Sequence, residues 1–199
     1  MTTAHTLAAA TPAAPAAAAA TRERGATVWL TGLPSAGKTT LARAVADRLA
    51  ATGRRTEVLD GDEIRRFLSQ ELGFTRADRH TNVTRIGYLA QALASHGVLV
   101  LAPVIAPYAA SRAAVRKRHA TGGTEYLEVH VATAVEVCAE RDVKGLYARQ
   151  AAGELTGLTG IDDPYEVPDA PELRIRTEGR SVAETAAELH AFLAERGLA

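Results

Sequence analysis

The sequence predicts a three-layer α/β fold, in which helices cover both faces of a parallel sheet. From residue 25 onward, short apolar segments alternate with segments that have the spacing of amphipathic helices. This alternation is typical of chains that build a parallel sheet through crossover helices. The chain has 199 residues, of which 47% are hydrophobic, and this suffices for one core of ordinary size. We therefore expect one globular domain over residues 25–199.

The first 24 residues have a different composition. Residues 8–20 read AAATPAAPAAAAA, in which alanine adds little buried surface and Pro12 and Pro15 interrupt any helix. A secretory signal would need a positively charged start, but no Lys or Arg occurs before Arg22. We expect residues 1–24 to form a mostly disordered tail.

The first elements of the domain are a strand and a helix. Residues 26–31, ATVWLT, form an apolar strand, and the glycine-rich segment GLPSAGKTT follows it. Residues 41–53 then have helical spacing, because Leu41, Val45 and Leu49 fall on one face and a glycine ends the run.

The later segments continue the alternation. We expect strands at residues 56–60, 98–102 and 126–131, and helices at residues 81–96, 109–120 and 133–142. Residues 145–172 are rich in Gly, Pro and Asp, and they are predicted to form a long loop. A loop of this length near the C-terminus of a compact domain is usually a lid or a binding loop.

The strongest motif is residues 32–39, GLPSAGKT, which match G-x-x-x-x-G-K-[ST] between a predicted strand and a predicted helix. Glycines let the backbone N–H groups of such a loop point at phosphate oxygens, and the helix N-terminus adds positive potential. Lys38 can reach the β- and γ-phosphates, and the Thr39 hydroxyl can bind Mg²⁺. The motif predicts a P-loop NTPase-type fold that binds a nucleoside triphosphate and Mg²⁺ through Gly32, Ser35, Ala36, Gly37, Lys38, Thr39 and Thr40.

Two acidic residues, Asp60 and Asp62, follow the second predicted strand. In open α/β folds, ligands bind at this carboxyl edge of the sheet. An acid there can accept a proton from an attacking hydroxyl or support Mg²⁺. The third strand, VLVLAP, does not end in the aspartate that usually supports the metal in GTPases and motor ATPases. Together with the short chain, this favours a kinase that phosphorylates a small molecule.

A cluster of basic residues comes next. Guanidinium groups suit phosphate or sulfate oxygens, and asparagine suits a base edge or a ribose. A solvated, salt-bridged helix face is the alternative. Phe74 could stack on a base, but its residue type alone favours a place in the core. The cluster comprises Arg65, Arg66, Arg76, Arg79 and Arg85, with Asp78 and Asn82 among them.

Taken together, these segments resemble the adenylylsulfate (APS) kinase family over essentially all of residues 25–199. The resemblance rests on GLPSAGKTT, LDGDEIR, LGFTRADRHTNVTRIG, PVIAPYAASR, EVHV, RDVKGLY and TGIDDPYEVP, in matching order and spacing. Members of this family transfer the γ-phosphoryl group of MgATP to the 3′-hydroxyl of adenosine 5′-phosphosulfate, which gives PAPS and ADP. The resemblance also implies a homodimer.

The resemblance implies roles for individual residues. Asp62 would be the acid near the 3′-hydroxyl and the metal. Apart from the resemblance, the motif and the sheet edge assign Thr39 and Asp60 to Mg²⁺. Lys144 would contact the acceptor nucleotide or the transferred phosphate, and Arg141 would close over ATP with the lid. The residues implied to bind the acceptor are Asp62, Arg65, Phe74, Arg79, Asn82, Ile105, Lys144 and Leu158, with Phe74 stacked on the adenine.

Two alternatives stay open. The first is a related kinase that phosphorylates another small hydroxyl compound in specialised metabolism. Leu158, which stands where the family usually has an aromatic residue, and Glu63, beside the anion site, favour it mildly. The second is a regulatory module that binds a nucleotide without catalysis, which the intact Lys38, Asp62 and Lys144 disfavour.

Composition argues against several other classes. Lys plus Arg and Asp plus Glu both number 23, unlike proteins that bind nucleic acid through bulk charge. No apolar run approaches the ~20 residues of a membrane span. Cys138 is the single cysteine and cannot form an intrachain disulfide, which suits a reducing cytoplasm. We expect no nucleic acid or membrane partner, and no metal besides the Mg²⁺ carried with ATP.

Overall fold

A computed structural model describes residues 23–199, so the tail expected over residues 1–24 lies, up to residue 22, outside the described residues. The predicted parallel sheet flanked by helices is confirmed. Within residues 23–199, every helix is too short or too polar to cross a membrane.

The sheet has five parallel strands in the order β2-β3-β1-β4-β5. The central strand pairs with β3 and β4, and its Trp29 lies beside Ala102 on one side and Glu128 on the other. Because all strands run in one direction, their carboxyl ends meet at one edge, and the loops that follow them can form a single site. The strands are β1 (Ala26–Thr31), β2 (Thr56–Val58), β3 (Leu99–Pro103), β4 (Glu125–Val131) and β5 (Leu173–Ile175).

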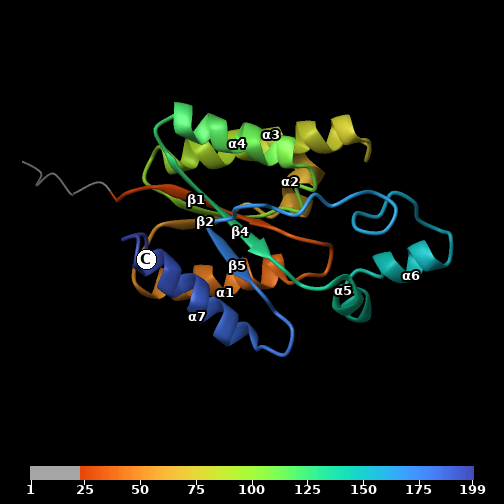
Figure 1. Cartoon of the computed structure of the whole chain (residues 1–199). Coiled ribbons are helices and arrows are strands. Elements are labelled where there is room, and N and C mark those ends of the chain that lie inside the picture. The colour runs from red at the N-terminus through yellow and green to blue at the C-terminus, as the bar shows by residue number, and fades with distance from the viewer. Residues whose placement is uncertain (1–22) are drawn as a thin grey trace, which may run out of the picture.

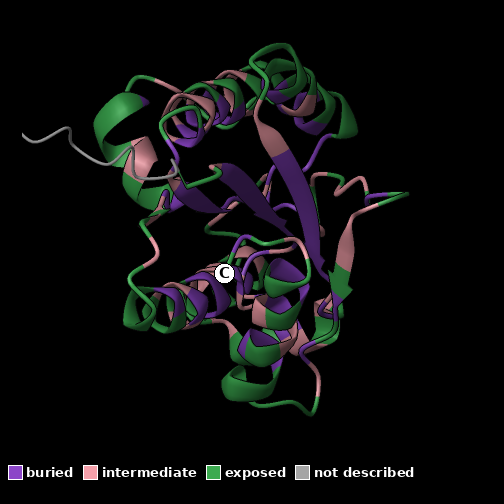
Figure 2. Ribbon diagram, turned by 90° about the vertical axis from the view of Figure 1, so that its left-hand side faces the viewer, coloured by how far each residue is buried: buried purple, intermediate pink, exposed green. Residues whose placement is uncertain are grey.

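Two pairs of helices cover the sheet (Figure 1). On one face, α1 (Lys38–Ala51) packs beside α7 (Val182–Ala194), and on the other face α3 (Arg76–Ala94) packs beside α4 (Ala109–Thr121). The three inner strands form a buried layer between them, and most exposed residues lie on the outer sides of the helices and in loops (Figure 2). This arrangement is the three-layer architecture that the alternating segments predict.

Successive side chains of the central strand pack on opposite faces of the sheet. Leu30 packs in the apolar cluster that contains Leu41 of α1, whereas Trp29 packs in the cluster that contains Ile86 of α3. Trp29 and Cys138 are fully buried.

Three short helices lie at the carboxyl end of the sheet (Figure 1). α2 (Gly61–Leu68) follows β2, and α5 (Val135–Arg141) and α6 (Leu146–Ala151) follow β4. The chain then returns to β5. We call residues 142–172 the lid segment.

Two predicted boundaries are wrong. The strand predicted at residues 56–60 ends at Val58, because the Asp60 side chain accepts hydrogen bonds from the first turn of α2 and starts that helix. The helix predicted at residues 81–96 begins at Arg76, where a capping box fixes its first turn.

The prediction of an unbroken loop at residues 145–172 is also wrong. Helix α6 forms within it, starts after a left-handed Gly145 and buries Tyr147. Its six residues are too few for helical periodicity to be recognised in the sequence. The elements α2, β5 and α7 were likewise not predicted as separate elements.

Candidate active site

The loop between β1 and α1 has a backbone suited to phosphate. Gly37 caps α1 with a φ of 98°, in the left-handed region that favours glycine. A Cβ on Gly32 would lie 2.5 Å from the carbonyl oxygen of Val131, so this position also requires glycine. Between them, Ser35 is half-buried with a φ of 61°, and Ala36 is buried. The two glycines of the motif are therefore needed for the shape of the loop.

Lys38 folds back into this loop. Its ammonium group donates hydrogen bonds to the carbonyl oxygens of Gly32 (3.0 Å) and Leu33 (2.7 Å). Burial lowers the pKa of Lys38 to about 8, while the carboxylate of Asp62 acts in the opposite direction. A desolvated ammonium group held mainly by carbonyl dipoles is well placed to bind an anion, whose charge would raise this pKa.

Thr39 and Asp60, the two residues predicted to support Mg²⁺, are in direct contact. Thr39 Oγ1 donates to Asp60 Oδ2 over 2.8 Å, and the N–H of Asp62 donates to Asp60 Oδ1 over 2.9 Å. Hydroxyl and carboxylate oxygens are the ligands that Mg²⁺ prefers. Within residues 23–199, no group of three or more His, Cys, Asp or Glu side chains could hold a metal. The donor set therefore fits a Mg²⁺ whose other ligands are phosphate and water oxygens.

An ion pair joins Asp62, in the first turn of α2, to Lys144, in the lid segment. Both side chains are 57% exposed and are therefore accessible to a substrate. Both also lie close enough to Lys38 to influence its pKa, which Asp62 raises and Lys144 lowers. The structure thus gathers the three residues predicted to be catalytic, although they come from three separate segments.

Arg141, at the end of α5, lies against the P-loop. It donates to the Thr177 hydroxyl over 2.9 Å and to the Ala36 carbonyl over 3.5 Å. Thr133 donates to the same Ala36 carbonyl over 2.9 Å and contacts the Thr177 hydroxyl. These contacts fix the guanidinium beside the predicted nucleotide site. Thr40, also assigned to that site, is exposed in the first turn of α1.

Phe74 is 66% exposed, so the core position that its residue type alone favours is wrong. The guanidinium carbon of Arg65 lies 4.4 Å from the ring centroid, and that of Arg79 lies 5.6 Å away. These cation–π contacts hold the ring at the surface. An exposed aromatic ring beside two guanidinium groups suits a ligand that has both a base and an anionic group.

Arg79 reaches from α3 to the lid segment. Its guanidinium donates to the Thr159 hydroxyl (2.9 Å), the Gly157 carbonyl (2.7 Å) and the Asp163 carboxylate (3.1 Å). Its Nε also donates to the Phe74 carbonyl over 2.9 Å. In this structure Arg79 therefore joins the exposed aromatic residue to the lid segment.

The rest of the basic cluster divides into separate sites. Asn82 is buried on α3, and its buried Oδ1 has no hydrogen-bond partner within the described structure. Arg85 instead pairs with Glu71 at 2.5 Å. Arg76 lies over the ring of Tyr108, 4.3 Å from its centroid. The five arginines of the cluster are therefore not one anion site.

The two apolar residues assigned to the acceptor differ in exposure. Ile105 is half-buried directly after β3, and its carbonyl oxygen accepts a hydrogen bond of 2.6 Å from the Thr31 hydroxyl. Leu158 is only 5% exposed and packs in the cluster that contains Leu30. Little of its side chain is free to meet a ligand, so the contact between Leu158 and the acceptor stays a prediction.

Sequence reasoning did not single out the residues that hold the lid segment and Arg141 in place. Asp163 and Thr159 bond to Arg79, and Thr177 bonds to Arg141. One signal was available for Asp163, because an acidic turn, TGIDDP, occurs in the same chain as a cluster of arginines. No local pattern marks Thr177, whose position depends on the return of the chain to β5.

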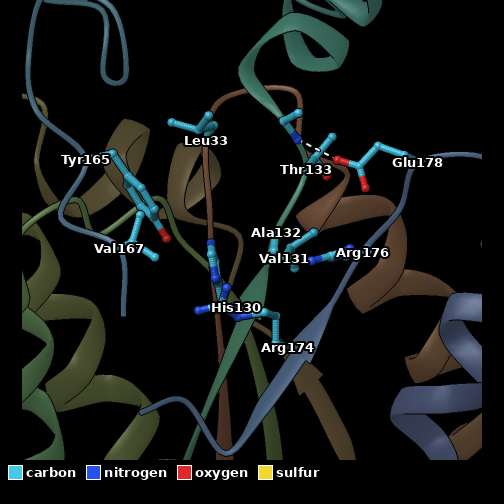
Figure 3. A pocket seen from close by; sticks show the side chains of 11 residues that line it. Leu33, His130, Val131, Ala132, Thr133, Tyr165, Val167, Arg174, Arg176 and Glu178 are labelled. Carbon is cyan, nitrogen blue, oxygen red and sulfur yellow. Dashed lines mark hydrogen bonds between the residues drawn. The ribbon is translucent and has the colours of Figure 1, made fainter. Parts of the chain in front are cut away.

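A cavity of about 660 Å³ opens beside the P-loop (Figure 3). Leu33 of the P-loop and Tyr165 of the lid segment line it, together with His130 and Arg174, which are neighbours on β4 and β5. Burial lowers the pKa of His130 to about 4. None of the residues predicted to be catalytic lines this cavity, so it is separate from the charged group described above.

Comparison with known proteins gives consistent results. Residues 24–176 match the family model described as adenylylsulphate kinase. The adenylyl-sulfate kinase of Synechococcus sp. (strain JA-3-3Ab) is 52% identical over 161 residues, which cover 81% of this chain and 89% of that protein. The structure of the Mycobacterium tuberculosis APS kinase CysC in complex with AMPPNP and APS is 45% identical, with a TM-score of 0.84 over 86% of this chain and 99% of that one. The hexameric APS kinase from Thiobacillus denitrificans is 36% identical, with a TM-score of 0.66 over 89% of this chain and 30% of that one.

Proposed function

Because the chain belongs to the adenylylsulphate kinase family, we infer that it transfers the γ-phosphoryl group of ATP to the 3′-hydroxyl of adenosine 5′-phosphosulfate (APS). The products are PAPS, an activated sulfate donor, and ADP. The observation that carries this inference is the group formed by Lys38, Asp62 and Lys144 at the carboxyl edge of the sheet. It supplies one cation for the donor phosphates, and one acid and one cation for the acceptor.

On the donor side, Lys38 and the N–H groups of the P-loop bind the β- and γ-phosphates of ATP. Phosphoryl transfer depends on positioning and charge neutralisation more than on covalent chemistry. The ammonium group of Lys38 bonds to the carbonyl oxygens of Gly32 and Leu33, and the phosphates of ATP would replace these contacts. Arg141, held beside the loop by Thr177, covers the nucleotide.

Mg²⁺ belongs to the same half of the site. Thr39 and Asp60 would hold it, directly or through water, because their oxygens already lie 2.8 Å apart. When bound, Mg²⁺ neutralises charge on the phosphates of ATP. The protein's own contribution is a hydroxyl and a carboxylate fixed at the start of α1 and α2.

On the acceptor side, Asp62 takes the proton of the 3′-hydroxyl as that oxygen attacks the γ-phosphorus. The bond from phosphorus to the β–γ bridging oxygen of ATP breaks, and ADP leaves. Lys144 neutralises negative charge on the transferred group. The transfer is direct and in line, without a phosphoenzyme. Closure of the lid segment excludes water, which would otherwise accept the phosphoryl group.

The acceptor nucleotide binds at the exposed aromatic ring. Phe74 stacks on the adenine, and Arg65 and Arg79 contact the phosphosulfate. Asn82, whose buried Oδ1 has no partner within the described residues, and Ile105 complete the proposed set of acceptor contacts. The 66% exposure of Phe74 supports this arrangement, because a ring with a packing role alone would be covered.

The test is ADP release, measured with a coupled assay, from MgATP and a panel of acceptors. We expect rapid turnover with APS and slow turnover with other nucleotides and small alcohols. Lys38→Ala should abolish turnover while leaving the fold intact, and near-normal activity of this variant would remove Lys38 from the donor site. Slow turnover with APS and rapid turnover with another acceptor would contradict the proposal.

One observation favours a second candidate, a related kinase for another small hydroxyl compound. Leu158 stands where the resemblance to the family places an aromatic partner for the adenine, and it is 5% exposed in the core. Losing one aromatic stack weakens binding by about 1 kcal/mol. The panel of acceptors separates the two candidates directly.

The homodimer and the cytoplasmic location expected from the sequence remain predictions. The APS kinase from Thiobacillus denitrificans, which is similar to this chain, is hexameric. Light scattering of the purified protein should give twice the mass of one chain, and fractionation of cells should give the location.

A further inference from the structure

Two segments far apart in the sequence are bound to each other beside the proposed acceptor site. We call residues 105–109, directly after β3, the acceptor wall, and residues 164–168, near the end of the lid segment, the lid return. The N–H of Glu166 donates to the Pro107 carbonyl over 2.8 Å. The N–H of Ala109 donates to the Glu166 carboxylate over 2.7 Å. The lid return therefore docks on the acceptor wall through its backbone as well as through side chains.

Arg112 bridges the same two segments from helix α4. Its Nη1 donates to the Ala106 carbonyl over 2.8 Å, and its Nη2 donates to the Glu166 carbonyl over 2.7 Å. Its Nε forms an ion pair with Glu128 Oε1 on β4 at 2.7 Å. The side chain is 3% exposed. One planar guanidinium thus joins the sheet, the acceptor wall and the lid return.

A hydroxyl group forms a second bridge between these segments. Thr31, at the end of β1, donates its single hydroxyl proton to the Ile105 carbonyl over 2.6 Å. The Tyr165 hydroxyl lies 3.0 Å from the same Thr31 oxygen and must therefore be the donor in that contact. Figure 3 shows the Tyr165 ring on the side of the cavity opposite Thr133 and Glu178, so the lid return also forms one wall of that cavity.

The acceptor wall has a backbone that needs such support. Ala106 is buried and has a φ of 41°, in the left-handed region that residues with a Cβ rarely adopt. Strained residues persist only when the surrounding contacts determine their conformation. The Arg112 hydrogen bond to the carbonyl of this same residue is such a contact.

We propose that Arg112 is a positioning residue for the acceptor: its guanidinium locks the acceptor wall to the lid return through the carbonyls of Ala106 and Glu166. The lock sets the position of Ile105 when the lid segment closes. This inference rests on the proposed function, because Ile105 borders the acceptor only in that account. The donor site lies outside the lock, since neither Lys38 nor Thr39 bonds to the two segments.

The test compares Arg112→Lys with Arg116→Lys. A lysine at position 112 keeps the charge beside Glu128 but lacks the planar fork that reaches both carbonyls. Arg116 is the matched control, because it also pairs with Glu128 and bonds to neither segment. We expect the KM for APS to rise about tenfold in Arg112→Lys, because the variant loses one charge-assisted hydrogen bond. The Kd of Arg112→Lys for an ATP analogue should stay within about twofold of the wild-type value. In Arg116→Lys, both this Kd and the KM for APS should stay within about twofold of wild type.

An unchanged KM for APS in a folded Arg112→Lys enzyme would overturn the proposal. Equal losses for APS and the ATP analogue would also overturn it, because they would reveal a purely structural role. If Arg112→Lys lacks a cooperative thermal transition, Thr31→Val tests the lock from its second bridge. This variant should raise the KM for APS and spare binding of the ATP analogue, and an unchanged KM would reject the lock. Wild-type turnover of APS, measured beside the variants, separates failure of this inference from failure of the proposed function.

Discussion

At the scale of single residues, the pKa of Lys38 should depend on whether ATP is bound. In the structure its ammonium bonds to two carbonyl oxygens of the P-loop, and burial lowers its pKa to about 8. Triphosphate would replace those dipoles with full negative charges, which favour the protonated form. Binding and protonation of this one side chain are therefore linked.

The linkage gives a measurable proton uptake. At pH 8 roughly half of the Lys38 side chains are neutral, so binding of a non-hydrolysable ATP analogue should take up about half a proton. Calorimetric titrations in buffers of different ionisation enthalpy measure this number. In Lys38→Arg the guanidinium stays charged at every accessible pH, and the uptake should disappear. Equal uptake in both proteins would contradict the assignment to Lys38.

The Asp62–Lys144 pair should matter for activity and little for stability. Both side chains are 57% exposed, and exposed ion pairs contribute at most about 1 kcal/mol. Removing a general base lowers turnover by about 10²–10⁴-fold. We therefore expect Asp62→Asn to lose at least about a hundredfold in kcat with a thermal midpoint close to that of wild type. A folded Asp62→Asn enzyme that keeps its kcat would exclude Asp62 as the base, and a large fall in the thermal midpoint would contradict the small contribution of the pair to stability.

At the scale of elements, α3 is joined to the lid segment by one arginine. Arg79 contacts Gly157, Thr159 and Asp163 across 78 to 84 positions of sequence. It also bonds to the carbonyl of Phe74, the residue proposed to stack on the acceptor. The position of the acceptor ring and that of the lid segment are thus coupled through this side chain.

Arg79→Ala should therefore raise the KM for APS far more than the KM for ATP. Asp163→Asn provides a milder partner variant, because it removes one charge from the lid segment and leaves the other contacts of Arg79 in place. Steady-state kinetics with each substrate varied in turn gives both constants. Equal rises in the two KM values would place Arg79 outside the acceptor site.

How well an element could be predicted depended on what stabilises it. The P-loop was predicted from a fixed motif. The strands β1, β3 and β4 were predicted from apolar runs, because their residues are buried on both faces of the sheet. Helix α2 has no buried residue, and its start depends on the side chain of Asp60. Strand β5 has three residues and forms only because β4 lies beside it.

The candidate site was predicted to a similar extent. Residues within the P-loop motif follow from local backbone chemistry, and in the structure Lys38 bonds to the loop and Thr39 bonds to Asp60, while their roles stay predictions. The contacts of Arg79, Arg112 and Thr177 join segments that are distant in sequence. Periodicity and spacing carry no information about such contacts, so the lock on the acceptor wall could not be predicted.

At the scale of the whole molecule, buried histidine should make the fold sensitive to acid. Burial lowers the pKa of His130 to about 4 from an ordinary value of 6.5. The unfolded chain therefore binds the proton more readily, and stability that is present above pH 6.5 is lost as the pH falls toward 4. For His130 alone, the loss at pH 5 is roughly 2 kcal/mol.

Urea denaturation at pH 7 and pH 5 measures this loss. Wild type should have the lower unfolding free energy at pH 5. In His130→Gln, which cannot titrate, the difference between the two pH values should be smaller by about 2 kcal/mol. An identical pH difference in the two proteins would show that His130 does not titrate differently on folding.

The central claim concerns the whole enzyme: the γ-phosphoryl group of ATP moves directly to the 3′-hydroxyl of APS. ³¹P NMR of a mixture of MgATP, APS and the protein follows donor and acceptor together. We predict a new 3′-phosphomonoester resonance that grows in equal amount to ADP, while the phosphosulfate resonance stays intact. ADP formation with free inorganic phosphate, or phosphorylation at any other position, would contradict the account.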